Sequence, residues 1–351
     1  MARMIRQSLT AYATPLCETV VETPVPRGTE VLVRVSRCGV CHSDVHLQDG
    51  YFGLGGDKKL DVTALRTLPF TLGHEIAGTV EQAGPDAQVA VGRSFAVFPW
   101  IGCGECAACK AGEENLCAAP RHLGIQVDGG FATHVLVPHP RYLIDHGSMS
   151  AGLAGAYMCS GITAFSALKR LSERAQRGPI LLVGLGGVGM MGLALALAMF
   201  PQPPIVADID ARKREAALAA GAAAAYDPAD PNARKALLRA TGGVAGAVDF
   251  VGSDGSLAFA LGAIARGGKV VITGLLGGSF STPIAMFPLR AMSIEGTFTG
   301  TLAEAEEMMA LARAGKVTPV PIIERPLSAA QASLDDLRNG RGVVGRVVLT
   351  P

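Results

Sequence analysis

The chain has 351 residues, a length typical of two domains that can each build a hydrophobic core. Hydrophobic residues make up 49% of the sequence and charged residues 17%, which argues against extended disorder. Lysine and arginine (31) balance aspartate and glutamate (30), so no net field would draw the chain to nucleic acid or to an anionic membrane.

The sequence contains no recognisable targeting signal. Residues 1–10 carry Arg3 and Arg6 but no apolar run follows, so we predict no signal peptide and a cytoplasmic location. Residues 179–200 carry no charge and would pass for a membrane span by hydropathy alone. Five glycines interrupt that stretch, so we interpret it as a buried strand, turn and helix.

The first 150 residues are rich in turns and hold short apolar runs at 31–35, 76–80 and 131–137. Runs of this length predict an antiparallel, barrel-like β domain. Residues 48–72 lie between them and show no clear periodicity. We expect a long loop there, and a loop of this length inside a compact domain usually has a functional role.

Eight cysteines in a long chain without a signal peptide indicate metal thiolates rather than a disulfide framework. Four of them lie close together, at Cys103, Cys106, Cys109 and Cys117. Four thiolates can surround one zinc ion tetrahedrally and leave no position for water, so this metal should be structural. Iron–sulfur clusters use overlapping spacings, so the spacing alone leaves that alternative open.

From about residue 180 onward, strand-like and helix-like runs alternate along the sequence. The strand-like runs are 180–183, 205–207, 247–251, 269–273 and 293–298. The helix-like runs are 188–199, 211–220 and 302–314. Repeated β-α-β order predicts a parallel sheet with helices on both faces. A final β-like run at 343–349 could rejoin the first domain.

A glycine-rich turn joins the first of these strands to the first helix, with the sequence Gly184-Leu185-Gly186-Gly187-Val188-Gly189. It fits G-x-G-x-x-G, which lets the backbone approach a pyrophosphate at a helix N-terminus. Asp208 ends the next strand, where a carboxylate would bind the adenosine ribose and repel a 2′-phosphate. NAD is therefore favoured over NADP, although Asp210 is a rival acceptor and Arg212 and Lys213 could accommodate a phosphate.

Three further motifs complete a pattern that runs through the whole chain. They are Cys41-His42-Ser43-Asp44-Val45-His46, Gly73-His74-Glu75 and Met158-Cys159-Ser160-Gly161-Ile162-Thr163. With the four-cysteine segment and the glycine-rich turn, the chain resembles the zinc-dependent alcohol dehydrogenases of the medium-chain dehydrogenase/reductase family. The resemblance implies a GroES-like β-rich catalytic domain (1–152 and 289–351) and a Rossmann NAD-binding domain with a doubly wound parallel sheet (153–288). The active site would lie in the cleft between them.

The resemblance also implies that Cys41, His74 and Cys159 bind the catalytic zinc, leaving one position for the substrate oxygen. Such a metal lowers the pKa of an alcohol, and hydride then passes reversibly to nicotinamide. Ser43 would contact the reacting oxygen and His46 would relay its proton, unless His46 is simply a surface histidine. The same resemblance places two carboxylates near the metal: Asp44, which would orient the His74 ring, and Glu75, for which a structural role is equally expected.

The resemblance implies further cofactor contacts, each of which could equally be a solvated or packing residue. These are His42 and Arg346 at the pyrophosphate, Thr163 at the nicotinamide, Lys213 at the ribose, and Val251, Gly274 and Leu275 along the cleft. The substrate pocket would have apolar walls at Tyr51, Trp100 and Leu275. Lys58, Lys59 and Arg66 could meet an anionic substrate tail, although a solvated lid is the favoured interpretation.

Together these features predict an NAD-dependent alcohol dehydrogenase with two zinc ions per subunit. Its substrates would be primary or secondary alcohols, including cyclic, aryl or ω-hydroxy-acid ones, with aldehydes or ketones as products. The family implies a homotetramer or homodimer, with no nucleic-acid or membrane partner. The rivals are a polyol, formaldehyde or cinnamyl-type dehydrogenase, and a non-catalytic NAD-binding relative with a redox-sensing or structural role.

Overall fold

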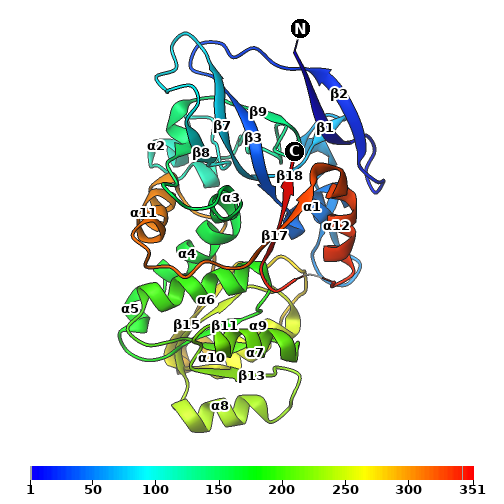
Figure 1. Cartoon of the computed structure of the whole chain (residues 1–351). Coiled ribbons are helices and arrows are strands. Elements are labelled where there is room, and N and C mark those ends of the chain that lie inside the picture. Colours follow the sequence, from blue (N-terminus) through cyan, green and yellow to red (C-terminus); the bar gives the residue numbers. More distant parts are fainter. Residues whose placement is uncertain (1, 342) are drawn as a thin grey trace.

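The computed structural model describes residues 2–341 and 343–351, and it contains a β-rich part and an α/β part (Figure 1). The α/β part is built on a six-stranded parallel sheet in the order β13-β12-β11-β14-β15-β16. In chain order its strands are β11 (Ile180–Val183), β12 (Ile205–Ala207), β13 (Ala224–Tyr226), β14 (Val244–Asp249), β15 (Ile264–Ile272) and β16 (Ser293–Gly296). This order confirms the predicted doubly wound Rossmann sheet.

Helices cover both faces of this sheet. Along β11, Ile180 and Leu182 belong to one hydrophobic core, while Leu181 and Val183 belong to a second core on the opposite face. Alternate residues of a strand point to opposite faces, so a strand covered on both sides is apolar throughout. The helices of this part are α6 (Gly187–Met199), α7 (Ala211–Ala219), α8 (Ala233–Thr241), α9 (Asp254–Ala263) and α10 (Met286–Arg290).

The β-rich part contains a seven-stranded sheet, in the order β10-β8-β7-β3-β18-β17 with β9 also paired to β3, and a three-stranded sheet, β2-β1-β6. Its strands are β1 (Arg3–Leu9), β2 (Cys17–Glu22), β3 (Val31–Gly39), β6 (Phe70–Thr71), β7 (Glu75–Ala83), β8 (Ser94–Val97), β9 (His134–Val137), β10 (Leu143–Ile144), β17 (Ile322–Pro326) and β18 (Arg346–Thr350). As predicted, the last β-run returns to this part: β18 pairs antiparallel with β3.

Residues 48–72 are more regular than the long loop expected from the sequence. They contain a small hairpin of β4 (Tyr51–Gly53) and β5 (Lys59–Asp61), then the 3₁₀ turn η1 (Thr63–Leu65) and β6. The hairpin reaches the α/β part, because a Cβ added at Gly55 would lie 2.7 Å from the carbonyl carbon of Gly278. This short hairpin was missed because its strands have only three residues each.

A long apolar helical segment crosses the interior between the two parts. It consists of α3 (Ala151–Ala156), the π-helical turn η4 (Tyr157–Gly161) and α4 (Ile162–Lys169). It is long and apolar enough to span a membrane, but 89% of its most apolar window is buried, as in the core helix of a folded protein. The stretch at 179–200, by contrast, is β11, a turn and α6, as predicted.

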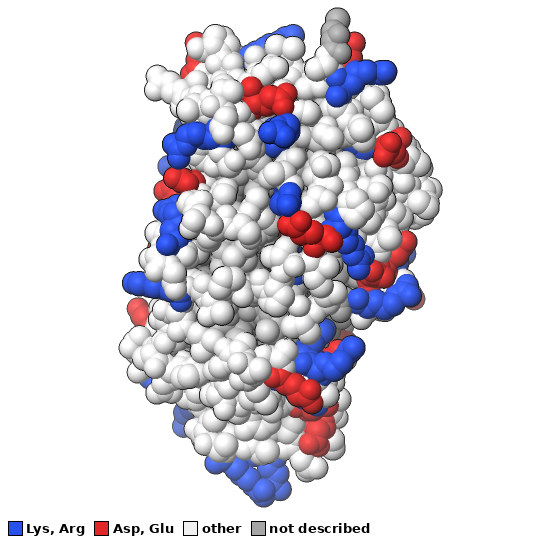
Figure 2. Space-filling view, in the orientation of Figure 1, with Lys and Arg blue, Asp and Glu red and all other residues white. Residues whose placement is uncertain are grey.

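Of the remaining helices, the one at Ser172–Ala175 packs beside the α/β part, and the others lie around the β-rich part and the connection between the parts (Figure 1). In chain order, the remaining helices are α1 (His42–Asp49), α2 (Ala107–Lys110), η2 (Glu114–Leu116), η3 (Pro140–Tyr142), α5 (Ser172–Ala175), α11 (Leu302–Arg313), η5 (Leu327–Ala329) and α12 (Ala330–Arg338). On the face drawn in Figure 2, basic and acidic side chains are interspersed, and no single-sign stripe of the kind that tracks nucleic acid is seen there.

Candidate active site

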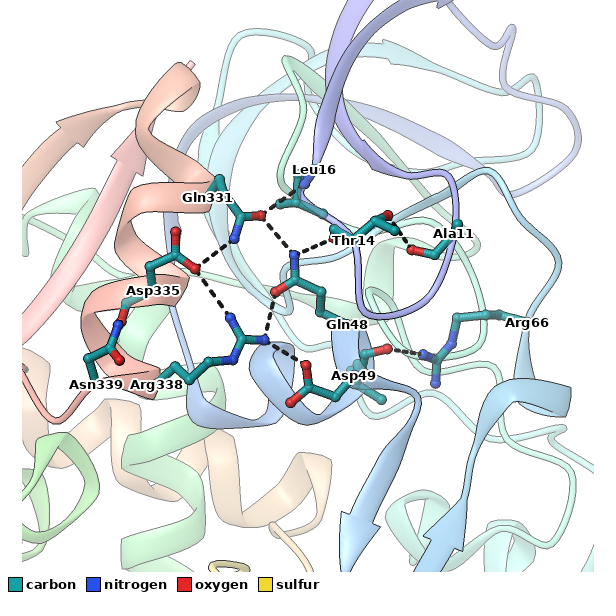
Figure 3. Close-up of polar contacts among 11 residues, drawn as sticks. Ala11, Thr14, Leu16, Gln48, Asp49, Arg66, Gln331, Asp335, Arg338 and Asn339 are labelled. Atoms are coloured by element: carbon teal, nitrogen blue, oxygen red, sulfur yellow. Dashed lines mark hydrogen bonds and ion pairs between the residues drawn. The ribbon is translucent and has the colours of Figure 1, made fainter.

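The first turn of helix α1 lies at the site, and it is capped by two of the site's own residues. Cys41 is the N-cap, and its backbone N–H donates to Asp44 Oδ2 at 3.0 Å. This reciprocal cap holds Cys41 and Asp44 together at the end of β3. The far end of α1 is held by α12: Arg338 donates to Gln48 Oε1 at 3.1 Å and to Asp49, and Gln48 donates to Gln331 Oε1 at 2.7 Å (Figure 3).

Three ligand-type side chains from separate segments converge beside α1. The potential ligand atoms of Cys41, His74 and Cys159 all lie within 4.8 Å of one another, and all three residues are buried. Cys41 Sγ lies 4.0 Å from Cys159 Sγ. Two thiolates about 2.3 Å from a tetrahedral zinc would be about 3.8 Å apart, so the spacing fits that ion.

The donor chemistry of this cluster also fits a metal. His74 is fully buried, and its Nε2 has no hydrogen-bond partner in the described part of the chain. A hydrogen bond from the Cys159 thiol lowers the pKa of Cys41 well below its usual value, so one thiolate forms readily. Asp44 Oδ1 lies 3.2 Å from His74 Nδ1, where it can fix the orientation of the ring.

Glu75 and Arg346 form a buried ion pair next to this cluster. Arg346 also donates to the Val40 carbonyl at 3.0 Å, and a Cβ at Gly187 would overlap its guanidinium. Burial raises the pKa of Glu75 to about 7, against the opposing effect of Arg346. Arg346 therefore links the metal-ligand cluster of the β-rich part to the glycine-rich turn of the α/β part.

The other predicted residues of α1 line its more open side. His42 is exposed, Ser43 and His46 are half-buried, and the His46 ring lies 4.8 Å from that of Phe52. Burial, followed by the nearby His42, lowers the pKa of His46, so the ring is neutral at pH 7 and can accept a proton.

The glycine-rich turn has the shape that a dinucleotide requires. Gly184 has φ +90, and a Cβ at Gly189 would overlap the Gly184 carbonyl, so both positions require glycine. A Cβ at Gly186 would meet open space, which leaves the backbone free to approach a phosphate. Asp208, at 8% exposure, accepts from Leu185 N at 2.6 Å and thus ties the end of β12 to the turn.

Most other predicted cofactor residues surround this turn at the carboxyl ends of the parallel strands. Val251 follows β14 and packs against Gly184, while Gly274 and Leu275 follow β15. Val188 is half-buried in the first turn of α6, and Thr163 is half-buried in α4. Ligands of open α/β sheets bind at this edge, beside the switch point between β11 and β14.

The basic residues near the predicted ribose site differ in how freely they can reach a ligand. Arg212 is paired with Asp210 at 3.0 Å, which holds the guanidinium beside that carboxylate. Lys213 is half-buried in the first turn of α7. The rival acceptor Asp210 is therefore occupied as the N-cap of α7 and as the partner of Arg212.

The predicted pocket walls occupy different positions around the cluster. The Trp100 ring lies 5.6 Å from the His74 ring, at the heart of the site. Tyr51 lies on the β4–β5 hairpin, with Lys59 Nζ 3.8 Å above its ring, and Leu275 is 49% exposed. The suggestion that Arg66 meets an anionic substrate is wrong: it is 8% exposed and donates to the carbonyls of Ile125 and Leu47.

Two residues of this region were missed in the sequence. His122 and Phe298 pack against Trp100, at ring-centroid distances of 5.3 Å and 5.6 Å. Neither belongs to a recognisable motif, and each lies in a connection between regular elements. Only the three-dimensional contact with Trp100 brings them to the site.

The four-cysteine segment folds into a separate lobe around α2 and η2. Its four sulfurs lie within 4.8 Å of one another, with Cys106 Sγ 3.5 Å from Cys109 Sγ and 3.8 Å from Cys117 Sγ. These spacings fit four thiolates around one tetrahedral zinc. A backbone N–H of Cys109 lowers the pKa of Cys106 to about 6, which favours the thiolate that a metal needs.

Comparison with known proteins gives the family. Residues 27–146 match the family described as Alcohol dehydrogenase GroES-like domain, and residues 187–314 match Zinc-binding dehydrogenase. An NAD-dependent alcohol dehydrogenase from Saccharolobus solfataricus is 36% identical over 342 residues, covering 96% of this chain and 97% of the relative. The chain belongs to the zinc-dependent alcohol dehydrogenases of the medium-chain family.

Two further relatives show the range of this zinc-dependent alcohol dehydrogenase family. The crystal structure of the alcohol dehydrogenase from Aeropyrum pernix has a TM-score of 0.87 and 30% identity, covering 99% of this chain and all of that one. A D-arabinose 1-dehydrogenase (NADP(+)) from Saccharolobus solfataricus is 29% identical, covering 98% of this chain and 96% of the relative. The protein is thus an NAD-dependent alcohol dehydrogenase whose cofactors are zinc and NAD.

Proposed function

We propose that Cys41, His74 and Cys159 hold the catalytic zinc and that the protein oxidises small alcohols reversibly at this site. The single observation that carries the proposal is the convergence of these three buried side chains from segments far apart in sequence. A zinc ion bound there would polarise the substrate oxygen and ease the loss of its proton. Cys103, Cys106, Cys109 and Cys117 would hold a second, structural zinc.

The chain's own residues would manage the proton and the geometry. Ser43 would receive the hydroxyl proton, and the neutral His46 ring would accept it on the open side of α1. Asp44 would keep the His74 ring aligned from 3.2 Å away. The Glu75–Arg346 pair would hold the carboxylate beside the site without a net buried charge.

NAD would bind in the cleft between a catalytic domain at 1–152 and 297–351 and an NAD-binding domain at 153–296. The boundary expected from the sequence, between 288 and 289, would separate β16 from the sheet in which it pairs with β15. Its pyrophosphate would lie on the backbone of the turn at Gly184–Gly189, with His42 and Arg346 opposite. The ribose would lie against Asp208, with Lys213 beside it. The remaining cofactor contacts proposed for the nicotinamide half are Thr163, Val251, Gly274 and Leu275.

Replacing Asp208 by serine should shift the cofactor preference. The variant loses the carboxylate that would bind the ribose hydroxyls, and it also loses the bond to Leu185 N, so kcat/KM for NAD should fall about tenfold or more. NADP should gain relative to NAD, because the repulsion of its 2′-phosphate is removed. Kinetics with both cofactors check this, with Asp230→Ser, an exposed aspartate of the α/β part, as the control. An unchanged cofactor ratio would contradict the role of Asp208.

The substrate range is tested directly by a panel of alcohols. Primary, secondary, cyclic, sugar and ω-hydroxy-acid substrates are oxidised with NAD and with NADP in parallel, and NADH formation is followed at 340 nm. We expect neutral alcohols to be oxidised, in line with the apolar rings around His74. Preference for sugars would favour the activity named for the D-arabinose relative, and the absence of any oxidation or carbonyl reduction would revive the non-catalytic alternative.

The assembly is proposed to be a homodimer or homotetramer in the cytoplasm, formed through the edge of the NAD-domain sheet. β16 is the terminal strand of that sheet, and a terminal strand can pair with another copy. Exposed apolar side chains lie just before it, including Ile284 at 85% and Leu289 at 62% exposure. Light scattering measures the number of copies directly.

A further inference from the structure

Three aromatic rings, those of Trp100, His122 and Phe298, pack against one another as a layer beside the metal-ligand cluster. His122 meets Trp100 edge-on at 5.3 Å and stacks on Phe298 at 6.1 Å, while Phe298 meets Trp100 at 5.6 Å. Trp100 in turn contacts His74. A molecule whose reacting carbon lies near His74 could extend along this layer, and the Trp100 ring alone separates the His122 ring from that of His74 in this chain of contacts.

His122 is the polar member that this layer leaves free. The Trp100 indole N–H is already used, donating to the Met158 carbonyl at 2.8 Å. His122 is only 3% exposed, yet its Nε2 has no hydrogen-bond partner among residues 2–341 and 343–351. A buried polar atom without a hydrogen bond is unfavourable, so pairing it with a ligand group stabilises the complex.

The backbone of His122 is held in a tight turn. Its carbonyl accepts from three successive backbone N–H groups, those of Ile125, Gln126 and Val127, and its own N–H donates to the Gln126 side chain at 3.2 Å. This tight turn fixes the backbone from which the imidazole projects. A fixed donor or acceptor discriminates between ligands better than a mobile one.

Phe298, the outer ring of the layer, is also held in place. Asn115 donates to its carbonyl at 2.7 Å, and the next residue, Thr299, has a left-handed backbone with φ 50 although it is not glycine. Such strained residues cluster at functional sites, where surrounding contacts maintain them. Phe298 is 42% exposed while Trp100 is 2% exposed, so the layer opens outward at Phe298.

The chemistry of His122 selects a neutral partner. Burial lowers the pKa of His122 to about 4, so the ring carries no charge at pH 7. Besides His74, the charged group that acts on His122 is Glu114, which is ion-paired with Arg141. A hydroxyl group can pair with a neutral imidazole nitrogen, whereas a carboxylate would need a cation that this layer does not supply.

We propose that His122 Nε2 binds a second hydroxyl group of the substrate, so that this enzyme selects alcohols carrying another hydroxyl several bonds from the reacting carbon. The inference rests on the proposed catalytic role of Cys41, His74 and Cys159, because it places the reacting carbon beside His74. It assigns substrate specificity to a residue that lies outside the metal-ligand and cofactor motifs. It also favours substrates with a neutral hydroxyl at the far end over substrates with an anionic tail.

The test compares the wild type with His122→Phe on matched substrates. The diols are 1,4-butanediol, 1,5-pentanediol and 1,6-hexanediol, each against the alcohol in which a methyl group replaces the far hydroxyl: 1-pentanol, 1-hexanol or 1-heptanol. At one chain length at least, His122→Phe should lower the diol-to-alcohol ratio of kcat/KM about tenfold, because an unpaired hydroxyl is then buried against phenylalanine. A diol has two equivalent ends that can react, but this statistical factor is the same for both enzymes and therefore cancels when their ratios are compared.

Two variants complete the experiment. His122→Gln, whose amide can reach the position of Nε2, should restore most of the ratio, and His139→Phe, an exposed histidine elsewhere, should leave it unchanged. If His122→Phe does not fold, the comparison of wild type with His122→Leu decides the question in the same way. A ratio that stays within twofold of wild type at all three lengths overturns the inference, whereas inactivity of the wild type toward every alcohol overturns the proposed function instead.

Discussion

Replacing Cys41 by serine is expected to lower kcat for alcohol oxidation by about a thousandfold or more while the fold is retained. A Lewis acid at the reacting oxygen contributes several kcal/mol, and each 1.36 kcal/mol is a factor of ten in rate. A serine hydroxyl at this position is a poor zinc ligand, so the zinc content should fall from two ions per chain to one. Metal analysis, NADH formation and thermal unfolding measure the three quantities on the same sample.

Cys38 provides a matched control three residues away. It is also fully buried, but burial raises the pKa of its thiol and it does not belong to the cluster of Cys41, His74 and Cys159. Cys38→Ser should therefore keep two zinc ions and most of the activity. If both serine variants lost activity equally with two zinc ions bound, the assignment of Cys41 as a ligand would be wrong.

Replacing Cys106 by serine should have the opposite effect: it should lower the thermal stability much more than it lowers kcat. Zinc held by four thiolates stabilises a small lobe by an amount on the order of 10 kcal/mol, because the ion binds only the folded segment. We expect the first thermal transition to fall by about 10 °C or more, with loss of one zinc ion per chain. The kcat of the protein that remains folded should stay within about threefold of wild type.

The exposed Cys17 on β2 supplies the control for this experiment. Cys17→Ser should alter neither the zinc content nor the unfolding transition. Full zinc content in Cys106→Ser would show that the lobe does not bind the metal through these sulfurs. A large fall in kcat at unchanged stability would show that the lobe takes part in the reaction, contrary to a closed site without an open position.

The central strands of the α/β part were predictable from the sequence because they are buried on both faces, whereas the half-buried edge strand β13 was not predicted. The run Ile180–Val183 is apolar at every position, and the glycines that follow it mark the turn without any knowledge of tertiary contacts. The hairpin at Tyr51–Asp61 was not predictable in this way. All three residues of its second strand are exposed, so no alternation of buried and exposed positions appears there.

The residues of the candidate site also fall into two groups, those that a sequence motif identifies and those that only the three-dimensional structure places. Cys41, Asp44, His74 and Glu75 lie in short motifs, whereas the placement of Cys159 depends on a π-helical turn inside a helix that the sequence analysis did not assign. Such turns often occur at functional sites, but they have no simple sequence pattern. His122 lies in an irregular connection, and its position beside Trp100 follows only from packing between distant segments.

The pairing of β18 with β3 has a consequence for how the protein is made. Arg346, at the start of β18, joins Glu75 and the turn at Gly187, yet it is separated from Cys41 by some three hundred residues. Synthesis runs from the N-terminus at about 5–20 residues per second, so Arg346 is added tens of seconds after Cys41 and Glu75. Until it emerges from the ribosome, Glu75 has no counter-ion, so a nascent chain would hold an unfinished and inactive centre.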